Sequence, residues 1–229
     1  MEVVLIIPAR GGSKRIPHKN LLPINNLPLL LYSINHALNS KLVNRVIVST
    51  DDPKIKQFSL DHGANVVLRP KELSDDKATS ESALIHVLDY LLAKENYSPD
   101  LVVFLQCTSP IRKSDDIDNA IKLFIDKNAD SLFSACINDK FIWALEKDGP
   151  KPLNYDYNHR KREQDMPPQY RENGSIYVFK PSLLRKSNNR LGGKMVIYPM
   201  NYWSSFQIDS PEDVALIDWI LKSGYDKRD

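Results

Sequence analysis

Short apolar runs, rich in β-branched residues, recur along the chain and predict strands. They fall at residues 3–7, 46–49, 66–68, 101–106, 132–137, 176–179 and 195–198. Several of these runs are continuously apolar instead of alternating with polar residues, as in strands that are covered on both faces. The pattern therefore favours a sheet that lies between two layers of helices.

Helical patterns separate these strands. Asp52 is suited to cap a helix with Pro53 at its first position and Gly63 beyond its end. Further helices are predicted at residues 80–93, capped by Ser80, at residues 114–127, and from Pro211 onward. This alternation predicts an α/β fold with a mostly parallel central sheet flanked by helices.

One stretch interrupts the alternation. Residues 138–172 are polar, rich in Pro and Tyr, and only weakly periodic. We interpret them as an insertion, within a single domain spanning residues 1–229, that contributes to a ligand site or an interface.

The totals exclude several classes of protein. Lys plus Arg number 31 against 29 Asp plus Glu, so a net charge of +2 offers no general attraction to nucleic acid or to a membrane. Two cysteines, Cys107 and Cys136, are too few for a disulfide framework and lack zinc-ligand spacing. With no signal-peptide pattern and no run of about 18 apolar residues, we expect a soluble, cytoplasmic protein.

The loop after the first strand holds the most concentrated chemistry. It reads ARGGSKRIPHKN over residues 9–20, at a strand end where open α/β sheets bind ligands. Gly11 and Gly12 allow close backbone approach, and Arg10, Lys14 and Lys19 are long enough to converge on phosphate oxygens. The spacings of a P-loop and of a dinucleotide fingerprint are both absent. The loop suits a polyphosphate, and the alternative is a solvated basic turn.

Six motifs extend this picture over nearly the whole chain. They are IPARGGSKRIPHKN (7–20), VIVSTDD (46–52), VVLRPKELSDDKATS (66–80), LQCTSPIR (105–112), YRENGSIYVF (170–179) and FQIDSPED (206–213). In this order they resemble the CMP-sialic acid synthetases, or acylneuraminate cytidylyltransferases. The resemblance implies a Rossmann-like fold of the nucleotide-diphospho-sugar transferase type, with a small insertion that serves dimerisation and the acceptor site.

The reaction that the resemblance implies joins CTP to a nonulosonic acid. The anomeric 2-hydroxyl of the sugar attacks the α-phosphate of CTP with Mg²⁺ and releases pyrophosphate, so that the protein supplies mainly alignment and charge. The implied nucleotide-binding residues are Ala9, Arg10, Gly11, Ser13, Lys14, Asn20, Arg69, Ala78 and Ser80, with Arg10, Lys19 and Asp209 as the catalytic set. Read without the resemblance, Asn20 is a turn-forming asparagine and Ser80 a helix cap.

The acceptor side is implied by later motifs. The expected contacts are Gln106, Ser109, Arg162, Arg171, Asn173 and Tyr177. A planar guanidinium suits the carboxylate of a keto acid. For Arg162 the alignment can shift by one residue, and the alternative is a solvated charge in a basic run. Arg112 suits either an anion or a turn cap.

The metal site departs from the family pattern. Many relatives read Asp-Ile-Asp where this chain has Gln207, Ile208 and Asp209. A single aspartate is sufficient for Mg²⁺ that also binds phosphates and water, whereas the neutral Gln207 is a weaker ligand and no base. The alternative for Asp209 is part of a helix start, ahead of Ser210 and Pro211.

Two alternatives stay open. The acceptor is a sialic acid or, with the same chemistry, legionaminate, pseudaminate, Kdn or Kdo; in another class, the chain is a nucleotide-binding module without catalysis. The aromatic side chains of the insertion, Trp143, Tyr155, Tyr157 and Tyr170, favour a homodimer contact.

Overall fold

The computed structural model describes residues 1–75 and 78–225 and contains a central seven-stranded sheet. In spatial order the strands are β11 (Met195–Met200), β7 (Ser131–Ile137), β10 (Tyr170–Phe179), β6 (Leu101–Leu105), β1 (Val3–Pro8), β4 (Arg45–Thr50) and β5 (Asn65–Leu68). Only β10 runs antiparallel to its neighbours among these strands. The predicted mostly parallel α/β sheet is confirmed.

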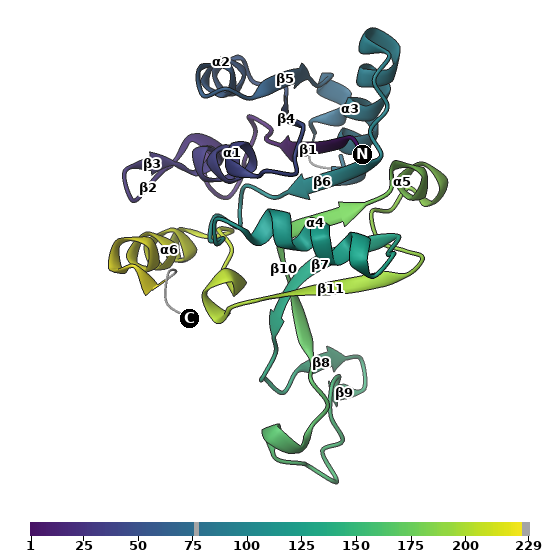
Figure 1. Ribbon diagram of the computed structural model, residues 1–229. Coiled ribbons are helices and arrows are strands. Elements are labelled where there is room, and N and C mark those ends of the chain that lie inside the picture. The colour runs from purple at the N-terminus through teal and green to yellow at the C-terminus, as the bar shows by residue number, and fades with distance from the viewer. Residues whose placement is uncertain (76–77, 226–229) are drawn as a thin grey trace.

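Helices cover both faces of this sheet (Figure 1). They are α1 (Leu29–Asn39), α2 (Pro53–Asp61), α3 (Ser80–Glu95), α4 (Asp116–Asp126) and α5 (Pro181–Ser187). The last helix, α6 (Pro211–Ser223), packs instead in a third apolar cluster through Ile217 and Ile220. One apolar cluster joins the sheet to α1 and α4, for example through Leu30 and Ile121. A second joins the other face to α3 and α5 through Leu84 and Leu184. Burial on both faces explains the continuously apolar strand runs.

The helix starts follow local sequence. Asp52 caps α2 by accepting hydrogen bonds from the backbone N–H groups of Lys54 and Ile55, as expected. Ser210 caps α6, with Asp213 completing a capping box. The expected Ser80 cap of α3 is wrong, because Thr79 is the capping residue and Ser80 is the first helical residue.

The insertion projects away from the sheet between β7 and β10 (Figure 1). It contains the hairpin of β8 (Trp143–Glu146) and β9 (Gly149–Pro152). Outside the insertion, a second hairpin of β2 (Pro23–Ile24) and β3 (Leu27–Pro28) lies ahead of α1. Residues 170–172 fall outside the insertion because they open β10 and pair with β7. The insertion, as the structure has it, spans residues 138–169.

The loops that matter for function lie together at one edge of the sheet, namely the edge formed by the carboxyl ends of its parallel strands. The parallel strands β1, β4 and β6 end there, and the antiparallel β10 begins there. The segment before α6 joins the same edge, because the Ile208 N–H donates to the Thr108 carbonyl at 2.8 Å. Ligands of open α/β sheets bind at this edge.

Candidate active site

The loop after β1 packs tightly against the loop after β4. The Gly11 N–H donates to Asp51 Oδ1 at 3.0 Å, and a Cβ on Gly11 would lie 2.6 Å from Asp52 Oδ2. A glycine is therefore needed here for close approach. The Asn20 side-chain amide donates to the Arg10 carbonyl at 2.9 Å and closes the loop on itself.

Lys19 and Asp209 meet at this edge although they are 190 positions apart. Lys19 opens a 3₁₀ turn (Lys19–Leu21), and its Nζ lies 3.0 Å from the Ile208 carbonyl and 3.4 Å from Asp209 Oδ1. The lysine side chain is 17% exposed and that of Asp209 is 55% exposed. Asp209 is thus open to a ligand, with a cation held beside it.

Two arginines tie the segment after β5 to the rest of the site, Arg10 to the loop after β1 and Arg69 to β4. Arg10 Nη1 donates to the Asp75 carbonyl at 2.7 Å. Arg69 is buried and donates through Nη2 to the Ser49 carbonyl at 2.7 Å and through Nη1 to the Leu73 carbonyl at 3.3 Å. Burial, the main cause, lowers the pKa of Arg69. Arg69 therefore braces the site from inside, beneath the more accessible Arg10.

The other expected nucleotide contacts lie along the same edge. Ala9 is buried, and its N–H donates to the Ser49 carbonyl at 2.9 Å. Ser13 is half-buried and Lys14 is exposed in the loop. The Ala78 N–H donates to Asp75 Oδ1 at 2.8 Å, just ahead of Ser80 at the start of α3.

Two glutamines complete the site on the β6 side. Gln106 directly follows β6, and Gln207 directly precedes Ile208. Both side-chain amides lie against Gly174 of β10, because a Cβ there would overlap Gln106 Oε1 and lie 3.2 Å from Gln207 Nε2. We call Arg10, Lys19, Gln106, Gln207 and Asp209 the strand-end cluster.

Two of the expected acceptor contacts are buried in a polar network. Asn173 accepts from Ser134 Oγ at 2.6 Å, donates to the Ser204 carbonyl at 3.0 Å, and accepts through its own carbonyl from Ser109 Oγ at 2.9 Å. Both Ser109 and Asn173 are almost fully buried. Their bonds hold β10 to its neighbours, and we do not include them among the proposed sugar contacts.

Tyr177 is likewise an internal residue. Its ring stacks on Phe104 at 5.2 Å between centroids, and its hydroxyl donates to Glu172. Burial, with a smaller contribution from Glu172, raises the pKa of Tyr177. The hydroxyl stays neutral and bonded within the protein, so Tyr177 is also left out of the proposed contacts.

The remaining two expected acceptor residues are exposed arginines. Arg171 is exposed near the start of β10, opposite Cys136. Arg162 belongs to the insertion, where its 74% exposed side chain pairs locally with Asp165 at 2.7 Å. Within the part of the chain that the structure describes, no hydrogen bond or ion pair joins either arginine to Lys19.

Arg112 has a larger structural role than the sequence suggested. It is buried, and its Nη2 donates to the carbonyls of Gln106 and Ser175, both at 3.0 Å. Burial lowers the pKa of Arg112 to about 10, so it stays charged at neutral pH. The guanidinium therefore fixes the backbone that presents Gln106. Its position after Pro110 and Ile111, an apolar context, was the available signal.

The described residues contain no group of three or more His, Cys, Asp or Glu side chains that could hold a metal alone. Asp209 offers one carboxylate, and Gln207 beside it offers only an amide oxygen. Such a donor set fits Mg²⁺ that takes its other ligands from phosphates and water.

The cysteines are poor nucleophiles, because burial raises the pKa of Cys107 to about 12 and that of Cys136 to about 11.

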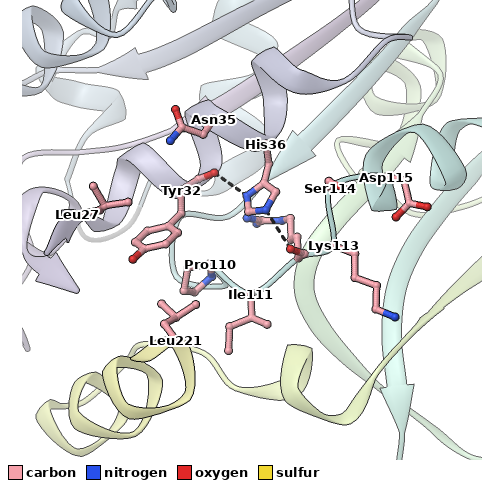
Figure 2. Close-up of a pocket in the computed structure, with 11 residues that line it drawn as sticks. Leu27, Tyr32, Asn35, His36, Pro110, Ile111, Lys113, Ser114, Asp115 and Leu221 are labelled. Atoms are coloured by element: carbon pink, nitrogen blue, oxygen red, sulfur yellow. Dashed lines mark hydrogen bonds between the residues drawn. The ribbon is translucent and has the colours of Figure 1, made fainter. Parts of the chain in front are cut away.

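A separate cavity of about 730 Å³ lies between α1, α6 and the segment after β6 (Figure 2). His36 lines it, with Nδ1 2.6 Å from the Tyr32 carbonyl and Nε2 3.0 Å from the Arg112 carbonyl. Burial first, and the Arg112 charge second, lower the pKa of His36 to about 4. No residue of the strand-end cluster lines this cavity.

Comparison with solved structures identifies the fold. The fold matches that of a CMP:2-keto-3-deoxy-manno-octonic acid synthetase complexed with CTP, with a TM-score of 0.74, 16% identity and coverage of 98% of this chain and 100% of the other. It also matches 4-diphosphocytidyl-2C-methyl-D-erythritol synthase from Anaerococcus prevotii, with a TM-score of 0.69 and 13% identity over 96% and 98%. This chain therefore shares the fold of these two structures.

The family follows from the sequence. The sequence model of the family described as cytidylyltransferase matches residues 4–224. The chain therefore belongs to this cytidylyltransferase family. It is 35% identical to pseudaminic acid cytidylyltransferase of Campylobacter jejuni over 77% of this chain and 78% of that protein. It is 33% identical to N-acylneuraminate cytidylyltransferase A of Danio rerio over 100% of this chain and 53% of that protein. The resemblance drawn from the six motifs is confirmed.

Among residues 1–75 and 78–225, no helix is both long and apolar enough to cross a bilayer.

Proposed function

We propose that this enzyme transfers CMP from CTP to the anomeric 2-hydroxyl of a nonulosonic acid and releases pyrophosphate. The observation that supports this most directly is the meeting of Lys19 and Asp209 beside the glycine-containing loop of Arg10. The names of the curated relatives support an acceptor of the sialic or pseudaminic type.

In this proposal the loop after β1 holds the triphosphate. Arg10 and Lys19 supply positive charge to its oxygens, and Gly11 lets the backbone approach them. The oxygen of the sugar 2-hydroxyl forms a bond to the α-phosphorus as the bond to the pyrophosphate oxygen breaks. Pyrophosphate leaves with the electron pair of that bond, and the hydroxyl proton passes to water. Cations held in place before the reaction stabilise the charge that builds up on the phosphate oxygens.

We further propose Mg²⁺ as the cofactor, with Asp209 as its protein ligand. The exposed carboxylate at a strand-end loop, close to the proposed phosphate site, supports this assignment. When bound, the ion would neutralise phosphate charge and orient the leaving group. Gln207 adds no negative charge, so a single protein carboxylate is expected to hold the ion.

The acceptor is proposed to lie beside Gln106 and Gln207, with Arg171 near its edge. The relatives' names divide between N-acylneuraminate and pseudaminic acid, and the C. jejuni pseudaminic acid enzyme, at 35% identity, makes pseudaminate the second candidate. Legionaminate, Kdn and Kdo complete the panel to be tested.

The insertion is proposed to join two copies of the chain, and the expected location is the cytoplasm. Exposed apolar side chains support the first point: Leu145 is 87% exposed and Trp143, Leu153 and Tyr157 are also exposed. Two free, buried cysteines suit a reducing compartment.

The deciding experiment measures pyrophosphate release by the purified protein with CTP, Mg²⁺ and each of the five acceptors. We expect turnover that requires Mg²⁺, with one acceptor preferred, and little turnover by the Asp209→Asn variant. Binding of CTP without pyrophosphate release in the presence of any acceptor would instead indicate a nucleotide-binding module.

A further inference from the structure

Gly174 lies where the two glutamines of the strand-end cluster meet. Its φ is +64°, in the left-handed region that favours glycine. It belongs to an irregular part of β10, because the register with β7 shifts between Glu172 and Tyr177. The bulge turns the Gly174 Cα toward the amides of Gln106 and Gln207.

The backbone on both sides of Gly174 is firmly held. Asn173 is bonded to Ser134, Ser204 and Ser109, and the Ser175 carbonyl accepts from the buried Arg112 at 3.0 Å. The backbone therefore has little freedom to move away from an added side chain. A Cβ at this position would instead displace the Gln106 amide, the atom group with which it overlaps.

We infer that Gly174 is a positioning residue that sets the Gln106 amide, and with it the Gln207 amide, for the sugar acceptor. The inference rests on the proposed function, since it assigns Gly174 to the acceptor half of that site. The three atoms nearest to a Gly174 Cβ all belong to Gln106 and Gln207, and none belongs to Arg10 or Lys19, which are proposed to hold the triphosphate. An alanine here should therefore affect the acceptor and spare CTP.

The chain offers a matched control at Gly193. Its φ is +61°, and a Cβ there would lie 2.5 Å from Asp130 Oδ2 and 2.6 Å from Asp130 Cβ. Gly193→Ala therefore introduces a similar backbone strain and an overlap of comparable severity, with three Asp130 atoms within 2.8 Å of the added Cβ. Asp130 directly precedes β7, so this change lies at the opposite edge of the sheet from the proposed site.

The test compares steady-state kinetics of the full-length wild type with G174A, G193A, Q106A and the double variant G174A/Q106A. We expect G174A to raise the acceptor KM about tenfold, the scale of a lost hydrogen bond to a charged group, while the CTP KM stays within about twofold. G193A should leave both KM values unchanged. The double variant should match Q106A alone, because truncating Gln106 removes the overlap.

Each outcome gives a distinct answer. Equal behaviour of G174A and G193A, equal rises in both KM values, or simple additivity in the double variant would overturn the inference and leave the proposed function intact. Absence of pyrophosphate release by the wild type with all acceptors would overturn the proposed function, and the inference with it.

Discussion

Polar side chains at the strand ends and in the insertion differ in how far apart in sequence their partners lie. At the strand ends, contacts join residues far apart in sequence, such as Lys19 with Asp209 and Ser109 with Asn173. In the insertion the contacts are local: Arg162 pairs with Asp165, and Asn154 bonds to Gln169 at 2.6 Å. The first region is therefore fixed by the whole fold, whereas the second is held together mainly by itself.

This difference predicts a separate function for each of the two regions. A site that orients a triphosphate needs groups held in place before the substrate arrives, which the buried network at the sheet edge provides. The insertion instead exposes Leu145 and Trp143, and its rings contact one another, as Trp143 does with Tyr155 at 5.8 Å. Such a surface suits contact with another chain.

The largest expected effect follows from removing the positive charge of Lys19 from the strand-end cluster. Lys19→Met should lower kcat on the order of 100- to 1000-fold, the scale of a lost charge-stabilising donor at a reacting centre. Lys186→Met, an exposed lysine of α5, is the control and should leave kcat unchanged. Pyrophosphate release under saturating substrates measures both, and equal activity of the two variants would contradict the assignment.

The next effect concerns stability and compares one asparagine from each region. Asn173→Ala should lower the free energy of unfolding by about 3 kcal/mol, because it leaves buried partners such as Ser134 without their bonds. The exposed Asn158 of the insertion is the control, and Asn158→Ala should cost less than about 0.5 kcal/mol. Urea unfolding measures both values. Similar small losses would show that the network contributes little.

A smaller effect depends on pH and compares two histidines. Burial and Arg112 lower the pKa of His36 to about 4 in the folded state, while the unfolded chain keeps the ordinary histidine pKa of 6.5. The unfolded state thus binds the proton first, so stability falls as the pH drops from about 6.5 to about 4, by at most about 3 kcal/mol.

His36→Gln should remove this acid-dependent loss. His159→Gln, at an exposed position of the insertion, should keep it. Unfolding curves across the pH range decide the matter, and an unchanged pH profile for His36→Gln would rule out His36 as the source.

The smallest effect on the single chain is expected in the insertion. Trp143→Ser should change the free energy of unfolding by less than about 0.5 kcal/mol, because the side chain is exposed, yet weaken self-association about tenfold or more. Trp219→Ser, an exposed tryptophan of α6, is the matched control. Sedimentation velocity measures the association, and a monomeric wild type at micromolar concentration would end the dimer proposal.

Much of the fold could be predicted because the relevant signals are local. Apolar runs marked the strands, and Asp52 and Ser210 marked helix starts through short-range hydrogen bonds. The loop of Arg10 and Lys19 was recognisable because its residue types and its place after a strand both indicate an anion site. The cap of α3 was missed by one residue, since Thr79 and Ser80 are chemically similar candidates.

The orientation of side chains along β10 could not be predicted. A strand has a period of two residues, and the bulge between Glu172 and Tyr177 breaks that period. The motif therefore gave no way to tell that Asn173 and Tyr177 are buried while the Cα of Gly174 faces Gln106. Arg112 was ambiguous for a related reason, because its three carbonyl and hydroxyl partners come from separate segments.

The sequence by itself thus determined the elements of this protein, their α/β order, and the chemistry of the loop after β1, since these depend on neighbouring residues. Only the tertiary structure decided that Lys19 meets Asp209, that Arg69 braces the site from inside, and that Gly174 lies beneath two glutamines. Those contacts depend on how distant strand ends meet at one edge of the sheet. That arrangement arises only when the separate segments pack together.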